Sequence, residues 1–254
     1  MKIVSLNVWG GKLLNSLLDF VAEESKNTDI FCFQEVLKLE SSYDGGSTEE
    51  RYNLFESLQE NLSEFNSYFS PAQDGFDCDK KTDIPVSFGL AIFIRKTLKV
   101  ESFNSIFIFG EKSSFVDGDF KTFPYNAQFL TFIDEKKEKT TIVNVHGISS
   151  WPKIDIPERI RQSLIINEFL NNKKTKEIIC GDFNLLPNTE SVHLLERDRV
   201  NLIKESGILN TRTSTSKDPH VSDYFFVSQG IKIKDFLVSD VIVSDHLPLI
   251  LNIN

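Results

Sequence analysis

The sequence has few cysteines, and their spacing does not suit a structural framework. Its 254 residues include only Cys32, Cys78 and Cys180, which are far apart and form no Cys-x-x-Cys pair. Disulfide frameworks and cysteine zinc sites are recognised by even numbers of cysteines at close, regular spacing. Cys32 and Cys180 lie in apolar runs, where a small buried thiol is the expected role. Disulfide-rich and zinc-finger classes are therefore excluded.

Long apolar segments are also missing. No apolar run approaches the roughly 20 residues that a transmembrane helix needs. The chain begins with the strand-like residues 1–6 and lacks a basic leader followed by an apolar stretch and a cleavage site. We therefore expect no membrane span and a cytoplasmic location.

An excess of positive charge is a third absence. The chain has 28 Lys and Arg against 37 Asp and Glu, which gives a formal net charge of −9. Proteins that bind duplex nucleic acid through its backbone usually carry a basic surface. A role with nucleic acid must therefore rest on local features of the chain.

Two common catalytic motifs are absent as well. The chain contains no Gly-x-Ser-x-Gly nucleophile elbow and no phosphate-binding Gly-x-x-x-x-Gly-Lys-Ser/Thr loop. The first is the signature of α/β-hydrolases and the second that of P-loop nucleotide hydrolases. Neither class is indicated.

The sequence does contain alternating strand and helix patterns along its whole length. Strands are expected at 2–8, 29–33, 88–94, 99–109, 127–134, 140–145, 178–180, 222–228, 231–238 and 247–253. Helices are expected at 13–26, 49–62, 155–171, 189–197 and 200–205, and long loops at 41–46, 71–85 and 110–120. Strict strand–helix alternation stops after the first third, which favours two packed sheets with helices outside. No linker divides the chain, so we expect one domain over 1–254, and a monomer.

Polar residues stand at the ends of several expected strands. Those at strand ends are Asn7, Glu35, His146, Asp182 and Asn184, and those at strand beginnings are Asp223, Asp245 and His246. If the last two strands run antiparallel to the others, all these residues meet at one end of the sheets. Each also has a local explanation, as a turn former, cap, Asx-turn residue or half-buried histidine. Their joint occurrence favours a functional cluster.

The carboxylates of this cluster indicate the metal that it would bind. Glu35, Asp182 and Asp245 offer hard oxygen ligands, and no Cys/His set accompanies them. Such ligands favour Mg²⁺ or Mn²⁺ over zinc. Magnesium held by one or two carboxylates commonly takes substrate phosphate oxygens as further ligands.

A series of short motifs runs through the chain in a fixed order. They occupy residues 5–10, 33–36, 89–92, 145–147, 181–184, 222–227 and 244–248. In these motifs the chain resembles the endonuclease/exonuclease/phosphatase superfamily. The resemblance implies an α/β fold, the four-layer α/β sandwich, in which two face-to-face, mainly antiparallel sheets are flanked by helices.

The resemblance also implies functional residues. The implied metal ligands are Glu35, Asn7 and Asp245. The implied catalytic residues are Asp182, Asn184, His246, His146 and Asp223. Asp182 would orient or deprotonate the attacking water, and Asn184 would bind the phosphoryl oxygens. His246, held by Asp223, would contact the scissile phosphate, and His146 would be a second phosphate or acid–base histidine.

One motif departs from the deoxyribonuclease-type branch of the superfamily. That branch pairs the histidine at the position of His146 with a Glu just before the strand at 89–92. The present chain has Val86, Ser87 and Phe88 there. The resemblance therefore predicts that this pair is absent or rebuilt.

Loops near the expected site indicate the substrate. Residues 40–51 include four acidic residues and one basic residue, and residues 71–85 include four acidic and two basic residues. Such an acidic rim would repel a long phosphate backbone. Candidate substrate-binding residues are Arg159, Arg161 and Arg212, which could clamp one phosphate group, and Trp151, which could stack on a ring. A solvated helix face explains the first two equally well, and packing explains Trp151.

Together these features predict a Mg²⁺- or Mn²⁺-dependent hydrolase of phosphate esters. The leading substrate class is nucleic acid or a nucleotide-like ester, which makes the protein a phosphodiesterase or nuclease. One alternative is a phosphatase or phosphodiesterase for phospholipid or inositol-phosphate head groups. A non-catalytic binding module on the same fold is the other.

Overall fold

A computed structural model describes residues 1–40, 43, 49–112, 114–134, 136–214 and 220–254 of the chain. Most of the expected loop at 41–46 lies outside these residues, as do 215–219 of the loop that follows Arg212.

Twelve strands form two sheets of six strands each. The strand order of the first sheet is β11 (Ile233–Val238), β12 (Leu249–Ile253), β1 (Lys2–Asn7), β2 (Ile30–Leu39), β4 (Val86–Arg95) and β3 (Phe65–Asp74). That of the second is β5 (Lys99–Phe109), β6 (Tyr125–Ile133), β7 (Lys139–His146), β8 (Lys176–Asp182), β10 (Asp223–Ser228) and β9 (Arg199–Asn201). Most neighbours pair antiparallel, and β1–β2 and β7–β8 pair parallel.

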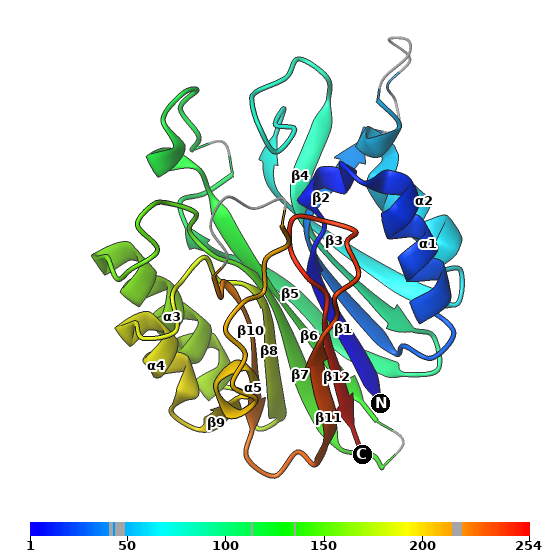
Figure 1. Cartoon of the computed structure of the whole chain (residues 1–254), viewed down its shortest axis with the longest axis vertical. Coiled ribbons are helices and arrows are strands. Elements are labelled where there is room, and N and C mark those ends of the chain that lie inside the picture. Colours follow the sequence, from blue (N-terminus) through cyan, green and yellow to red (C-terminus); the bar gives the residue numbers. More distant parts are fainter. Residues whose placement is uncertain (41–42, 44–48, 113, 135, 215–219) are drawn as a thin grey trace.

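Helices lie on the two outer sides of the paired sheets, as Figure 1 shows. The first sheet carries α1 (Leu14–Glu24) and α2 (Leu54–Asn61), and the second carries α3 (Pro157–Asn171), α4 (Glu190–Glu196) and α5 (Leu202–Glu205). Short 3₁₀ turns are η1 (Trp9–Gly11), η2 (Glu50–Asn53) and η3 (Phe120–Thr122). On α1 the residues at helical spacing, Leu17, Phe20 and Val21, are buried. The predicted four-layer α/β sandwich is confirmed.

Strand directions bring the polar strand ends to one end of the molecule. β12 runs antiparallel to β1, and β10 runs antiparallel to β8 with Asp223 opposite Asp182. The starts of β10 and β12 therefore lie beside the ends of β1 and β8, as the sequence predicts. The two chain termini lie at the opposite end (Figure 1).

A layer of buried amide side chains joins the two sheets. Gln34 Nε2 donates a hydrogen bond of 2.7 Å to Asn144 Oδ1, and Asn144 Nδ2 donates one of 3.0 Å to the carbonyl of Phe33. Gln128 Nε2 likewise donates to the carbonyl of Leu90 at 3.1 Å. Buried polar groups must be paired to avoid a desolvation cost, so these bonds favour one relative position of the sheets.

Three sequence predictions are wrong in detail. β3 was not predicted, and residues 71–74 of the expected loop at 71–85 belong to it. As an edge strand, β3 can accommodate Pro71 and many polar side chains. Residues 199–201 form β9 where part of a helix was expected, and β2 continues beyond Glu35 to Leu39.

The described ranges contain no helix that is both long and apolar enough to cross a membrane.

Candidate active site

Glu35 lies at an irregularity in the middle of β2. The pairing of β2 with β4 shifts register between Phe33 and Val36, and Glu35 has a φ of 58°. A non-glycine residue in this left-handed region is uncommon and costs conformational energy. A bulge of this kind redirects a side chain out of the regular alternation of a strand. It places the Glu35 carboxylate at the end of the sheets.

Asn7 connects the two sheets through its side chain. Its Nδ2 donates to Glu35 Oε1 at 2.9 Å and to Asp182 Oδ2 at 3.1 Å, and its Oδ1 accepts a hydrogen bond from Trp9 N at 3.0 Å. Asn7 is fully buried. The amide therefore fixes two carboxylates that come from different sheets.

The end of β8 requires the residues found there. Gly181 has a φ of 134°, and a Cβ on it would lie 2.0 Å from the carbonyl oxygen of Val145. Asp182 Oδ1 then accepts a hydrogen bond from the backbone N–H of Asn184 at 2.9 Å. Asn184 has a φ of 54°, which Asn tolerates better than most residues, and its Nδ2 donates to Gly147 O at 3.1 Å.

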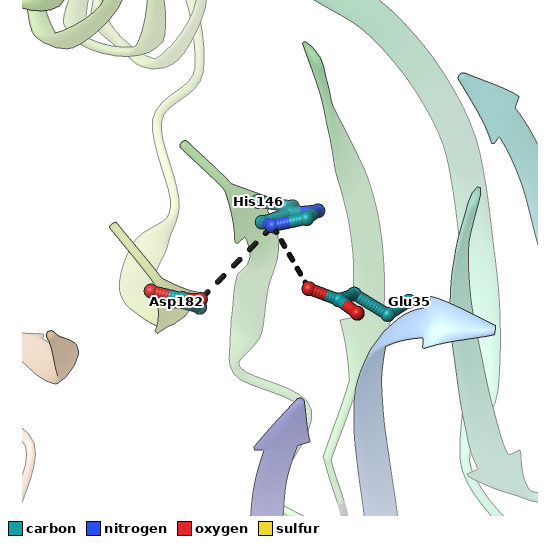
Figure 2. Close-up of side chains that lie close together, drawn as sticks. All are labelled: Glu35, His146 and Asp182. Atoms are coloured by element: carbon teal, nitrogen blue, oxygen red, sulfur yellow. Dashed lines mark ion pairs between the residues drawn. The ribbon is translucent and has the colours of Figure 1, made fainter. Parts of the chain in front are cut away.

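His146 lies between two carboxylates, as Figure 2 shows. Its Nε2 is 3.6 Å from Glu35 Oε1 and 4.0 Å from Asp182 Oδ2. Phe88 packs against the imidazole with 5.9 Å between ring centroids. The carboxylate beside His146 is therefore Glu35 of β2, and an aromatic ring stands where the deoxyribonuclease-type branch would carry its Glu.

His246 is held by Asp223 at the opposite side of the cluster. Its Nδ1 lies 2.9 Å from Asp223, whose Oδ2 also accepts hydrogen bonds from Thr211 Oγ1 at 2.6 Å and Ser222 Oγ at 2.8 Å. Burial lowers the pKa of His246, but the charges of Asp223 and Asp182 outweigh it and raise the pKa above its usual value. The His246 imidazole therefore holds its proton more tightly than a free histidine does.

Asp182 is the centre of the cluster. Its Oδ2 lies 3.5 Å from His246 Nε2. Burial raises the pKa of Asp182, but the positive charges of His246, Lys153, His146 and Arg212 outweigh it and hold the pKa well below its usual range. Asp182 thus stays ionised although it is almost completely buried.

Arg212 holds the loop that carries Asp245 and His246. Its Nη2 donates to Asp245 Oδ2 at 2.5 Å, and its Nη1 contacts His246 Nε2. The guanidinium of Arg212 and the imidazole of His246 lie beside each other and form a site that attracts an anion. Asp245, implied as a metal ligand, is paired with Arg212 here.

The donor set fits a hard divalent cation. One ligand atom each from Glu35, His146 and Asp182 lies within 4.8 Å of the others, and a second group of this kind consists of Asp182, Asp223 and His246. Carboxylate oxygens dominate these groups, and the buried amide of Asn7 orients two of the carboxylates. Oxygen-rich sites of this type suit Mg²⁺ or Mn²⁺.

Comparison with known proteins identifies the family of this chain. Residues 4–246 match the model of the Endonuclease/Exonuclease/phosphatase family. The chain belongs to this family. Members of the endonuclease/exonuclease/phosphatase family are phosphoric ester hydrolases. A comparison with curated protein sequences found no match.

Solved structures of the endonuclease/exonuclease/phosphatase family share the fold at low identity. A family protein from Leptotrichia buccalis is 19% identical with a TM-score of 0.74, and the match covers 100% of this chain and 99% of that one. A mannosyl-6-phosphatase from Bacteroides thetaiotaomicron is 15% identical with a TM-score of 0.73, over 100% and 99%. The human Nocturnin catalytic domain, with bound sulfate, is 19% identical with a TM-score of 0.69, over 100% and 93%.

Arg159 lies outside the cluster of candidate catalytic residues. Its guanidinium is fully buried and makes five hydrogen bonds to backbone carbonyls. The accepting residues are Ile148, Ser150, Pro152 and Ile154. With all its N–H groups in use, Arg159 is placed to support the loop 148–154 rather than to bind a phosphate.

The other predicted substrate residues are dispersed. Arg161 is exposed on α3 and pairs with Glu168 at 2.8 Å. Trp151 is 70% exposed and has its ring centroid 6.4 Å from that of His220. Among the predicted arginines, Arg212 is the one that contacts the cluster.

Lys153 is a site residue that sequence reasoning missed. Its Nζ donates a hydrogen bond to Asn184 Oδ1. Burial lowers the pKa of Lys153 and the nearby charge of Asp182 raises it, with a net lowering. The sequence offers only a weak signal for this role, a lone lysine in a loop after His146. Its position depends on the loop that Arg159 supports.

Proposed function

We propose that this protein is a Mg²⁺- or Mn²⁺-dependent phosphodiesterase, with nucleic acid or a nucleotide-like ester as its leading substrate class. The observation that carries the proposal is the environment of Asp182. An ionised, buried carboxylate stands among positive side chains and is oriented by two amides, Asn7 and Asn184. This arrangement suits a carboxylate that orients a water beside a bound phosphate and accepts its proton as the water attacks, and the low pKa of Asp182 makes orientation the larger part of this role.

The hydrolysis proceeds by attack of water on phosphorus. Asp182 takes a proton from the water as its oxygen bonds to phosphorus, and the bond from phosphorus to the leaving oxygen breaks. The leaving oxygen gains a proton, a step for which His146 is the candidate acid. Holding the water and the ester in line provides much of the rate enhancement in such reactions.

The phosphoryl group is bound by groups on the Asn184 side of the cluster. Lys153 and Asn184 are in contact, and the His246 imidazolium and Arg212 lie beside each other. Fixed positive donors of this kind stabilise charge that develops on phosphoryl oxygens. Asp223 keeps the His246 ring in its orientation.

Glu35 would hold the metal ion, and Asn7 lies beside it and donates a hydrogen bond to the Glu35 carboxylate. A divalent cation there supplies charge neutralisation for the phosphoryl oxygens. Asp245 is available to this role once its ion pair with Arg212 opens.

The balance of charge favours a small ester over a long polymer. The net charge is −9. Within the described residues, the cations placed to bind a phosphate at the site are those of the cluster itself. A phospholipid or inositol-phosphate head group is the alternative substrate class. The similarity to a mannosyl-6-phosphatase supports testing a monoester as well.

The proposal is tested by hydrolysis of bis(p-nitrophenyl) phosphate and p-nitrophenyl phosphate with Mg²⁺, with Mn²⁺ and with chelator. Turnover should require the metal, and Asp182→Asn should lower kcat by about 10²–10⁴-fold, as expected for loss of a general base. Asp235→Asn, an exposed acid on β11, is the matched control and should retain full activity. Metal-independent turnover, or normal activity of Asp182→Asn, would refute the mechanism.

A further inference from the structure

A row of aromatic rings leads from the surface to the catalytic cluster. Phe76 and Phe123 have ring centroids 4.7 Å apart, Phe123 and Tyr125 are 5.4 Å apart, and Tyr125 and His146 are 5.4 Å apart. The outer end of the row is Phe120, whose ring lies 6.1 Å from that of Phe76. The inner end is the imidazole of a proposed catalytic residue.

These rings line a cavity of about 240 Å³ that we call the aromatic pocket. Its lining residues are Glu35, Phe76, Cys78, Phe88, Phe120, Phe123, Tyr125, His146 and Ser149. The cavity is therefore continuous with the catalytic cluster through Glu35 and His146. A group bonded to a phosphorus atom at the cluster can reach it without leaving the site.

In the described part of the chain, no lysine or arginine lines the aromatic pocket, and its one carboxylate is that of Glu35. Burial raises the pKa of Tyr125, so its phenol stays neutral and adds no charge. The cations of the site, Lys153 and Arg212, are instead grouped around Asn184 and His246. The site thus has one side for an anionic phosphoryl group and another for a group without charge.

Phe120 gives the aromatic pocket an exposed ring at its edge. Half of its surface (50%) is accessible, whereas Phe76, Phe123 and Tyr125 are almost completely buried. A ligand that covers an exposed ring at the edge of a cavity buries additional apolar surface, which favours binding. An aromatic ring inserted between such side chains gains stacking and edge-to-face contacts.

Resting on the proposed function, we propose that the aromatic pocket binds one uncharged planar ring of the substrate, of the size of a single nucleobase. The cavity is smaller than the roughly 300–1,000 Å³ of a typical drug-sized site, so it suits one ring rather than an extended chain. The preferred substrate is then a small ester that carries a base-like ring, and its phosphate lies over Asp182.

The test compares two diesters that differ only in the ring, thymidine 5′-(methyl phosphate) and its analogue without the base. Stacking of one base on aromatic side chains corresponds to about 5- to 150-fold in affinity. We expect kcat/KM for the compound with the base to be higher by about this factor. Phe120→Ala should bring the ratio toward one, and Phe120→Trp should preserve it.

Leu237→Ala is the matched control, because Leu237 is a similarly exposed apolar residue (40%) on β11, outside the pocket. It should leave the ratio unchanged. An equal kcat/KM for the two diesters in the wild-type protein would overturn the inference. Preference for hexyl methyl phosphate over both would also overturn it, in favour of an acyl chain.

A measurement of binding distinguishes this inference from the proposed function. Calorimetry with the Asp182→Asn protein and Mg²⁺ measures the affinity for the two diesters without turnover. A preference for the base in binding, combined with no hydrolysis of any phosphate ester by the wild type, would refute the proposed function and keep the ring site. Equal affinities would refute the ring site.

Discussion

Asp182 shows how single residues determine the chemistry of this site. Burial alone would raise its pKa, yet the imidazoles of His246 and His146, together with Lys153, keep it ionised. Lys153 is the member of this set that no motif indicates, and it contacts the amide expected to face the phosphate. Its contribution can be separated from that of the histidines.

Lys153→Ala should lower kcat/KM by about 10- to 100-fold, because a hydrogen bond from a charged donor contributes about 1.5–3 kcal/mol. Lys153→Arg should recover part of the loss, since the positive charge is kept. Steady-state kinetics on bis(p-nitrophenyl) phosphate provide the measurement. Lys204→Ala, which removes an exposed lysine paired with Glu196, is the control. Wild-type kinetics for Lys153→Ala would contradict the assignment.

The pair of His246 and Asp223 predicts a pH dependence. The carboxylate charges raise the pKa of His246, so the imidazolium persists above the usual value near 6.5 and is lost as pH rises further. We expect kcat/KM to fall on that alkaline side. Asp223→Asn removes a negative charge and lowers the pKa of His246, so the fall should move to lower pH.

A pH–rate profile of both proteins measures this shift, with Asp235→Asn as a distant charge control. Identical alkaline limbs in the wild type and Asp223→Asn would show that His246 is not the group that titrates.

At the scale of elements, the start of α4 depends on a residue from another segment. Asp155 accepts hydrogen bonds from the backbone N–H groups of Glu190 at 2.7 Å and Ser191 at 3.0 Å. It also accepts one from Ser191 Oγ at 2.6 Å. Burial raises the pKa of Asp155, but these bonds outweigh it and the pKa is lowered. The loop before α3 is thereby tied to α4.

Asp155→Ala should lower the free energy of unfolding by about 1–2 kcal/mol, as for loss of a helix cap. Because the pKa is lower in the folded state, this stabilisation is present above the unfolded value near 3.9 and disappears as pH falls through the folded value. Urea unfolding of both proteins at pH 7 and at pH 3 is the measurement. Asp240→Ala, at an exposed acid, should show no difference, and an equal gap at both pH values would contradict the linkage.

Elements with regular apolar spacing could be predicted from the sequence, and irregular ones could not. The helices α1 and α3 and the strands β5, β7 and β10 lie close to their predicted ranges. β3 was missed because it is an edge strand, and an edge strand does not need a continuous apolar face that a sequence pattern would reveal. The bulge at Glu35 was missed because no local pattern marks a register shift that depends on the partner strand.

The residues of the candidate site also fall into those that the sequence indicates and those that it does not. Strand-end position and motif order indicated Asn7, Glu35, His146, Asp182 and Asn184, which the fold brings together with Asp223 and His246. Arg159 looked like a phosphate ligand because sequence does not show whether a guanidinium is buried. Lys153 was overlooked because its place depends on a loop held by five tertiary hydrogen bonds.

At the scale of the whole molecule, the sandwich and the family could be predicted from motif order and strand patterns. Prediction stops where loops determine specificity, and parts of two acidic or mixed-charge loops lie outside the described residues. The single domain, the cytoplasmic location and the monomeric state stay predictions. Size-exclusion chromatography with light scattering would test the last.

The layer of buried amides between the sheets has a consequence for how the proposed activity is lost. Asn7 and Glu35 belong to one sheet, and His146 and Asp182 belong to the other. Any sliding of one sheet over the other would therefore separate Asn7 and Glu35 from His146 and Asp182. The proposed activity should therefore depend on the alignment of the two sheets, and displacements that leave every strand intact should abolish it.

Replacement of Asn144 should reveal this dependence of activity on sheet alignment. Asn144→Leu removes the hydrogen bonds that join Asn144 to Gln34 and to the Phe33 carbonyl across the two sheets, so the alignment should weaken before the sheets themselves unfold. In a urea titration, activity should vanish at a lower concentration than far-UV circular dichroism, by a wider margin in Asn144→Leu than in wild type. Coincident curves for both proteins would mean that the two sheets part only when the whole molecule unfolds.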